Sequence, residues 1–188
     1  MKQTETIRRI VEALDRAGIP YMLTGSFASS YHGVPRASQD IDLVIETGEA
    51  ELRLLVGLLP QSEYYVDLGM ALEAARRESQ FNVLDLVTGW KADLIVRKSR
   101  PFSLAEFGRR TEADFEGLRV FVASPEDVVL SKLEWAKKGQ SRRQIEDVAG
   151  LLQARASELD REYIEKWVKE LGLEAEWQRA CELAGIAG

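Results

Sequence analysis

The spacing of hydrophobic positions predicts alternating helices and strands over the first two thirds of the chain. Apolar residues recurring every three or four positions, together with start and stop signals, predict helices at 7–17, 27–31, 52–59 and 67–78. Compact apolar or β-rich runs predict strands at 19–23, 41–45, 81–87, 90–96 and 118–122. The third and fourth of these strands flank Thr88-Gly89, which favours a β-hairpin. Ser103 and Glu106 have the spacing of a capping box, which predicts a short helix opening at Ser103.

The last third of the sequence is helical in its pattern. The stretch 124–127 reads Ser-Pro-Glu-Asp, which joins a capping residue, a first-turn proline and acids, and so predicts a helix start. Ser141 and Ser157 are predicted to cap two further helices, and a fourth follows near the C-terminus. We therefore predict two domains, a mixed domain over 1–122 and a helical region over 123–188.

Composition and charge narrow the classes of partner. The formal net charge of −6 over 188 residues argues against a generally basic surface that binds nucleic acid. Cys181 is the only cysteine, so no internal disulfide forms, which fits a reducing cytoplasm. The apolar stretch Leu52–Leu59 is too short to cross a bilayer, and residues 1–9 predict no signal peptide, so no membrane partner is expected. Within this acidic chain, a local basic cluster is formed by Lys137, Lys138, Arg142 and Arg143.

Two aspartates interrupt a strand that is otherwise made of core residues. Alternation along residues 41–45 places Asp40 and Asp42 on one face and the large aliphatic residues on the other. The two acids then lie about 7 Å apart, because a strand rises roughly 3.3 Å per residue. Like charges that close repel unless a cation lies between them. Mg²⁺ is the expected cation, since it prefers oxygen ligands and accompanies phosphates.

A third acid is expected from a neighbouring strand. Asp93, within the apolar run WKADLIV, is one candidate, and Asp85, within NVLDLV, is the other. The competing interpretation is a half-exposed strand whose aspartates simply face solvent. The pair Gly25-Ser26 weighs against that interpretation, because a strand, a small pair and an immediate helix allow the backbone to approach a phosphate closely.

These pieces resemble a known signature. Thr24-Gly25-Ser26, a gap of thirteen residues and Asp40-Ile41-Asp42-Leu43 resemble the nucleotidyltransferase superfamily that includes DNA polymerase beta and the antibiotic nucleotidyltransferases. Thr24 departs mildly from the apolar residue usual before the glycine. More closely, the chain looks like bacterial nucleotidyltransferases related to abortive-infection type IV toxins. The stretches that carry this likeness are PRASQDIDLVI, TGWKADLIV, ASPEDVVLSKLEWAKK and RRQIEDVAGLL.

The resemblance implies a fold and a chemistry. The fold is α+β, a nucleotidyltransferase domain whose small mixed sheet is flanked by helices, with a helical C-terminal region. Asp40, Asp42 and Asp93 would be the catalytic acids and would hold two Mg²⁺ ions, for which Mn²⁺ can substitute. Asp93, favoured over Asp85 by the family pattern, would also help to deprotonate the acceptor. The chain would transfer a nucleoside monophosphate from an NTP, such as ATP, to an acceptor hydroxyl with release of pyrophosphate.

The nucleotide and its acceptor have their own candidate contacts. Gly25 and Ser26 would bind the triphosphate, and Lys132 would contact the triphosphate or the acceptor. Arg36 could grip a phosphate, hold the acid pair or simply be an exposed loop arginine. Asp147 could pair with Lys132, position the acceptor or simply face solvent. The resemblance favours RNA, tRNA included, or protein as acceptor, and a toxin–antitoxin or phage-defence role with a cognate partner.

Two other functions fit the same residues. One is a non-catalytic, antitoxin-like module that keeps the fold and binds a nucleotide or a partner. The other is a small-molecule nucleotidyltransferase of the aminoglycoside type. The presence of all three acids and the Gly-Ser turn favours the enzyme. The sequence does not identify the base of the NTP, the acceptor or the oligomeric state.

Overall fold

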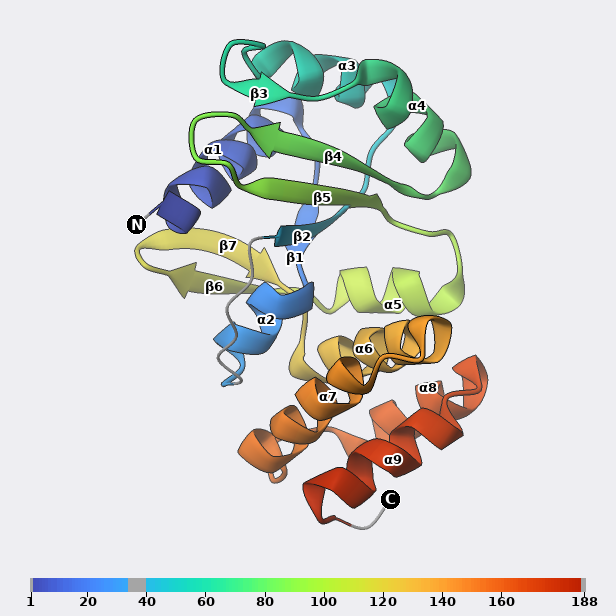
Figure 1. Cartoon of the computed structure of the whole chain (residues 1–188). Coiled ribbons are helices and arrows are strands. Elements are labelled where there is room, and N and C mark those ends of the chain that lie inside the picture. Colours follow the sequence, from blue (N-terminus) through green and yellow to red (C-terminus); the bar gives the residue numbers. More distant parts are fainter. Residues whose placement is uncertain (1, 34–39, 187–188) are drawn as a thin grey trace. The chain divides into compact units, whose positions relative to one another are not determined.

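A computed structural model of the chain describes residues 2–33 and 40–186 (Figure 1). The contacts between these residues divide them into two compact units. The first unit contains residues 2–26 and 40–123, and the second contains residues 27–33 and 124–186. Gly25, Ser26 and the three candidate acids all belong to the first unit.

The first unit is organised around a mixed sheet. Its strands, with their bounds, are β1 (Tyr21–Leu23), β2 (Asp40–Ile45), β3 (Tyr64–Tyr65), β4 (Gln80–Asp85), β5 (Lys91–Val96), β6 (Thr111–Phe115) and β7 (Leu118–Val122). They follow the order β3-β4-β5-β2-β1-β7-β6 across the sheet (Figure 1). The pairs β2·β5 and β1·β7 are parallel and the other pairs are antiparallel. The predicted hairpin is confirmed as β4 and β5, whereas the short β3 and the polar β6 were not predicted.

Helices precede, connect and follow the strands of this unit. They are α1 (Lys2–Ala17), α2 (Gly25–Tyr31), which begins in the first unit, α3 (Glu49–Leu58), α4 (Leu68–Arg77) and α5 (Pro101–Gly108). The start predicted at Ser103 is wrong, because α5 begins at Pro101 after Arg100 as its cap residue. The fixed φ of a proline is already helical, which opens the helix two residues earlier. The Ser103 hydroxyl instead accepts a hydrogen bond from Nε of Arg100 at 3.0 Å.

The two faces of the sheet differ in chemistry. In β2 the side chains of Ile41, Leu43 and Ile45 are fully buried, while those between them are exposed or half-buried. The buried face continues into β4 and β5, and α1, α3 and α4 pack together against the sheet. Burial of aliphatic side chains holds this layer together, at about 25 cal/mol per Å² of apolar surface removed from water. The opposite face is therefore the one that carries Asp40 and Asp42.

Asp85, the alternative third acid, belongs to the buried face. Its carboxylate accepts hydrogen bonds from the Thr6 hydroxyl at 3.0 Å and from the backbone amides of Val87 and Thr88 at 2.9 and 3.1 Å. Burial raises the pKa of the Asp85 carboxyl, but the hydrogen bonds from Thr88, Thr6 and Val87 together outweigh burial and lower it. Asp85 thus ties α1 to the turn of the β4–β5 hairpin and takes no part in a site on the other face.

We expect Asp85→Ala to lower the free energy of unfolding by about 3 kcal/mol, because it removes the buried carboxylate that accepts from the Thr6 hydroxyl and from the part-buried amides of Val87 and Thr88. The lowered pKa adds a pH signature. The stabilisation that the Asp85 carboxylate contributes is complete above its ordinary pKa of 3.8 and is lost as pH falls through the lower pKa of the folded state. Urea unfolding of wild type and variant at pH 7 and at lower pH measures both effects. Asp114→Ala is the control, since Asp114 caps an exposed turn by accepting from the amide of Gly117. Equal losses in the two variants would contradict the buried role of Asp85.

The second unit is helical in the residues that the structure describes. It contains residues 27–31 of α2 and four further helices. These are α6 (Pro125–Gly139), α7 (Arg142–Arg155), α8 (Arg161–Leu171) and α9 (Glu174–Ala184). The predicted start of α6 is confirmed, since Ser124 accepts a hydrogen bond from the amide of Asp127 at 3.2 Å. The helix predicted to open at Ser157 begins instead at Arg161, because Asp160 caps it by accepting from the amide of Tyr163.

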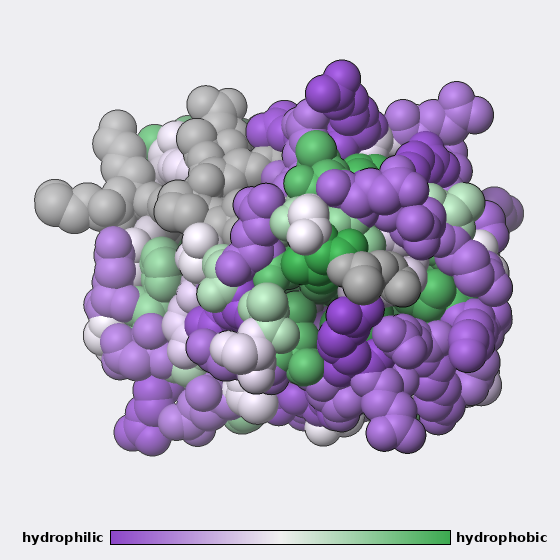
Figure 2. All heavy atoms as spheres, turned by 90° about the horizontal axis from the view of Figure 1, so that it is seen from below, coloured by the Kyte–Doolittle hydropathy of each residue, from purple (hydrophilic) through white to green (hydrophobic). Residues whose placement is uncertain are grey.

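The surface of the molecule is largely hydrophilic on the side seen in Figure 2, with a smaller group of apolar side chains near the middle of that view. Among the described residues, no helix has the length and apolar character needed to cross a membrane.

Candidate functional site

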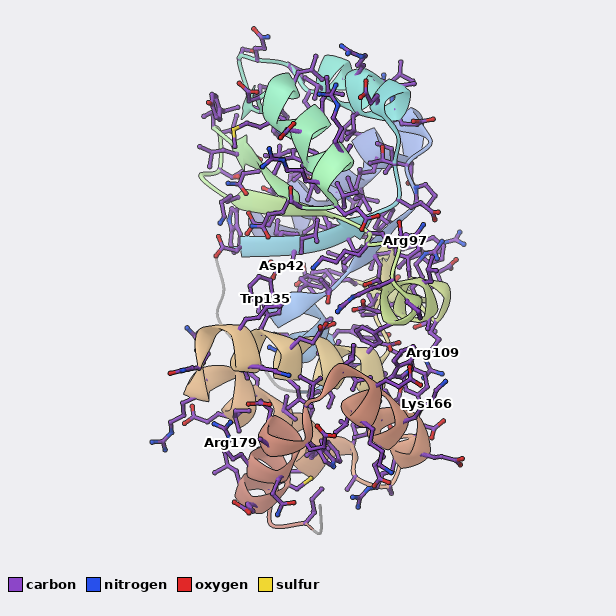
Figure 3. The ribbon with its side chains drawn as sticks, turned by 90° about the vertical axis from the view of Figure 1, so that its right-hand side faces the viewer. Asp42, Arg97, Arg109, Trp135, Lys166 and Arg179 are labelled. Carbon is purple, nitrogen blue, oxygen red and sulfur yellow. The ribbon has the colours of Figure 1, made fainter. Side chains whose placement is uncertain are left out.

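The three predicted acids lie on one face of the sheet. In the parallel pair β2·β5, Asp42 is the register partner of Asp93, and Asp40 is the partner of Lys91. Register partners on neighbouring strands point to the same face and lie about 4.8 Å apart along the hydrogen-bonding direction. Asp40, Asp42 and Asp93 therefore share one side, away from the helices that cover the buried face. Figure 3 shows Asp42 beneath β2, on the side away from α3 and α4.

Gly25 is pressed against the Asp42 side chain. The amide of Thr24 donates to the carbonyl of Asp42 at 3.0 Å, which fixes the start of α2 beside β2. A Cβ atom at Gly25 would lie 2.0 Å from Oδ2, 2.7 Å from Cγ and 3.0 Å from Cβ of Asp42, and Gly25 has a φ of +62°. Only glycine satisfies both the positive φ and this close approach. Ser26 follows within the same turn and is buried.

A lysine that the sequence analysis missed lies among these acids. The Lys91 ammonium is 3.4 Å from Oδ1 of Asp40 and 3.1 Å from Oδ2 of Asp93. Burial lowers the pKa of Lys91, but the hydrogen bonds and charges of Asp93 and Asp40 outweigh burial and raise it. Lys91 is therefore a cation at neutral pH. The same alternation that grouped the aspartates would have placed Lys91 beside Asp93, two residues away on the same strand face.

Asn82 is a second neighbour that sequence reasoning did not find. It is the register partner of Asp93 in the antiparallel pair β4·β5, so its exposed amide lies on the acidic face. At the other ends of β2 and β5 lies a further ion pair, in which Nη2 of Arg97 is 2.8 Å from Oε1 of Glu46. Because asparagine is depleted in strands, its presence at position 82 was the sequence feature that could have indicated a functional residue.

The acidic face has the donor chemistry of a divalent-cation site. Three carboxylates supply hard oxygen ligands of the kind Mg²⁺ takes. Oδ1 of Asp93 is buried and accepts no hydrogen bond from the residues that the structure describes, which is a costly state for a carboxylate oxygen and one that a cation would relieve. In the part of the chain that the structure describes, however, no three acidic, histidine or cysteine side chains are already arranged around a common metal position. The residues fit the metal provided that Lys91 gives up its place between Asp40 and Asp93.

The remaining predicted contacts lie elsewhere. Arg36 falls outside the described residues. Lys132 belongs to the second unit, where its ammonium is 2.7 Å from Oδ2 of Asp147 and 3.3 Å from Oε1 of Gln144. Both members of this ion pair are buried, so Asp147 does not face solvent. Pairing with Lys132 was one of the predicted alternatives for Asp147.

The fold of the chain recurs in solved structures. No protein-family model and no curated protein sequence matches the chain. A crystal structure of ANT(2")-Ia in complex with adenylyl-2"-tobramycin superposes with a TM-score of 0.61, at 18% identity, over 94% of this chain and 99% of that one.

The chain has the nucleotidyltransferase fold. A second structure, an antigenic nucleotidyltransferase-like protein from Paracoccidioides brasiliensis, superposes with a TM-score of 0.55 at 18% identity, over 93% of this chain and 91% of that one. The predicted α+β nucleotidyltransferase architecture is thereby confirmed. Because the identity is only 18%, the likeness establishes the fold alone. The chemistry depends on the residues of the sheet face.

Proposed function

We propose that the chain is a metal-dependent nucleotidyltransferase that moves a nucleoside monophosphate from an NTP to an acceptor hydroxyl. The observation that carries this proposal is the convergence of Asp42 and Asp93, as register partners, on the sheet face that Gly25 approaches. Nucleotidyl transfer would need both an acidic centre and a close backbone approach to phosphate, and in the first unit Gly25 lies directly against the Asp42 side chain.

The residues of the chain have distinct roles in this reaction. The backbone at Gly25 and Ser26 lies at the start of α2, where amide groups favour bound phosphate. Asp40, Asp42 and Asp93 would hold Mg²⁺ or Mn²⁺, which when bound neutralises the charge that develops on the phosphoryl oxygens and leaving group. The carboxylate of Asp93 would accept the acceptor's proton. The acceptor oxygen forms a bond to the α-phosphorus, the bond from that phosphorus to the β-phosphate bridge breaks, and pyrophosphate leaves.

Arg36 and Lys132 remain proposed contacts to phosphate or acceptor. The ammonium of Lys132 is already paired with Asp147, so it would contribute to nucleotide binding only by exchanging that partner. RNA or protein is the proposed acceptor, with RNA approaching the basic cluster of Lys137, Lys138, Arg142 and Arg143. A toxin–antitoxin or phage-defence role, with a cognate partner, rests on the resemblance of the sequence motifs.

Two observations favour other functions. The ANT(2")-Ia structure contains an adenylylated tobramycin, and its fold covers almost all of this chain, which favours a small-molecule acceptor as the second candidate. The position of Lys91, between two of the three acids, favours a non-catalytic binding module as the third. The three candidates differ in what accepts the nucleotide, or in whether anything does.

The proposal predicts a labelled product. Wild-type protein incubated with each α-labelled NTP, Mg²⁺ and total tRNA or cell lysate should transfer label to an acceptor, and a chelator should abolish the transfer. Gels separate labelled RNA from labelled protein, and chromatography with an aminoglycoside panel detects a labelled small molecule. Product only with the aminoglycosides selects the second candidate.

The binding-module candidate has its own outcome. It predicts that a folded protein is stabilised by a nucleotide or a partner yet transfers label from none of the four NTPs, with Mg²⁺ or with Mn²⁺. Thermal unfolding with each NTP, in the presence and absence of metal, measures that stabilisation.

A further inference from the structure

Lys91 occupies the position in the acidic site where a positive charge is needed. Asp40, Asp42 and Asp93 place three carboxylates on one sheet face, and repulsion between them favours any cation that can reach them. The Lys91 ammonium contacts two of the three, at 3.4 Å from Asp40 and 3.1 Å from Asp93. With Lys91 in place, two ligands of a metal ion are engaged by a side chain of the protein itself.

The burial of Asp93 distinguishes this arrangement from an ion pair that is exposed on both sides. The Asp93 side chain is 13% exposed, whereas Lys91 and Asp40 are 37% and 52% exposed. Among the described residues, Oδ2 of Asp93 faces Lys91 and the buried Oδ1 accepts no hydrogen bond. The site is thus partly neutralised, and its most buried oxygen is still available to a ligand. A lysine on a flexible stem, more than a third exposed, can leave such a site without unfolding the strand.

We propose that Lys91 is a resident counter-ion of the acidic face, which holds Asp40 and Asp93 together in the metal-free protein and is displaced when a divalent cation binds. This inference rests on the cation site of the proposed function. Displacing Lys91 costs part of the binding energy of the metal, so Lys91 weakens metal binding and at the same time stabilises the metal-free fold. The released ammonium stays within reach of the site, where it can face the phosphates of a bound NTP.

The substitution Lys91→Met separates these two effects. It keeps a chain of similar length and apolar character but removes the charge. Without metal, we expect the unfolding temperature to fall by about 2–4 °C, since an ion pair of this exposure contributes on the order of 1 kcal/mol. With Mn²⁺ or Mg²⁺, we expect the variant to bind about tenfold more tightly than wild type, because the Lys91 ammonium no longer competes for the carboxylates of Asp40 and Asp93. Isothermal titration calorimetry and metal-dependent thermal shifts measure both.

Two controls accompany this variant. Lys169→Met removes the same charge from an exposed helical position in the second unit and should leave metal affinity unchanged. Lys91→Arg keeps the charge and should bind metal as weakly as the wild type. Equal metal affinity of wild type and Lys91→Met, or absence of binding to both, would overturn the inference.

A second measurement uses the unmodified protein. An amine-acetylating reagent, with mass spectrometry of the peptides, reports how freely each lysine reacts. We expect the acetylation rate of Lys91 to rise severalfold on adding Mg²⁺, relative to that of Lys169 in the same sample, because pairing with Asp40 and Asp93 no longer protects it. A rate that stays constant while the metal binds would show that Lys91 keeps its place, and would refute displacement.

The outcomes distinguish this inference from the proposed function. Transfer of labelled nucleotide by the wild type, combined with unchanged metal affinity in Lys91→Met, refutes only the role of Lys91. Tighter metal binding in Lys91→Met, combined with no transfer by the wild type, refutes only the proposed chemistry.

Discussion

Asp42→Asn is expected to lower nucleotide transfer by at least about 10³-fold while the protein stays folded. Asp42 lies between Asp93, its register partner, and Gly25, whose backbone approaches it closely. Asparagine has nearly the same shape, so it preserves this packing, but it removes the charge that would hold a divalent cation. Loss of a charge-stabilising group at a phosphoryl centre typically costs this much or more. Single-turnover transfer of labelled nucleotide, with circular dichroism as a check on the fold, measures the effect.

A matched variant tests whether charge alone matters. Glu112→Gln also replaces one carboxylate by an amide, at an exposed position of β6 beside Arg119. It should transfer nucleotide at the wild-type rate. Asp93→Asn should resemble Asp42→Asn, since both acids would serve the same proposed centre. A folded Asp42→Asn protein with more than about a tenth of wild-type activity would remove Asp42 from the proposed metal ligands.

Gly25→Ala is expected to damage both the fold and the site. The positive φ of +62° costs a residue with a Cβ about 1–2 kcal/mol. The new Cβ would also meet Oδ2, Cγ and Cβ of Asp42 at 2.0, 2.7 and 3.0 Å, so rotating the carboxylate alone does not remove the clash. Either Asp42 or the start of α2 must shift. We expect a further loss of stability and a fall in kcat/KM of about 10²-fold, which is the usual cost of displacing a reacting group by about 1 Å.

Gly18 provides the control for this substitution. It has a φ of +71°, similar to that of Gly25, but a Cβ there would meet nothing within 4 Å. Gly18→Ala should therefore show the backbone cost alone, with activity unchanged. Urea unfolding and initial rates on the two variants isolate the contribution of the close approach. Identical behaviour of the two variants in both measurements would show that contact with Asp42 has no consequence.

Local patterns determined much of this fold in advance. The spacing of apolar residues located α1, α3 and the strands β2, β5 and β7, because burial of one face imposes a period of 3.6 on a helix and of 2 on a strand. Cap signals were less reliable. Ser124 caps α6 as predicted, but Pro101 and Asp160 replaced Ser103 and Ser157 as starting signals, since several capping arrangements compete within a few residues.

The acids of the site were also predicted from sequence, for a physical reason. Alternation along one strand groups Asp40 with Asp42 whatever the rest of the chain does. The choice between Asp85 and Asp93 was different, because each is an acid in an apolar run of the same hairpin. The family resemblance favoured Asp93. The structure adds that Asp93 is the partner of Asp42, while Asp85 accepts hydrogen bonds on the opposite face.

Sequence patterns alone thus located most of the helices and strands, placed Asp40 and Asp42 on one strand face and indicated a small residue at the start of α2. Tertiary structure decided the strand order, which brings β5 beside β2 although more than forty residues separate them in the chain. It also decided that residues 27–33 group with the C-terminal helices, and that the Lys91 ammonium lies beside Asp40. These features depend on contacts between distant segments. Local spacing carries no information about them, because many pairings of the same strands bury the same apolar faces.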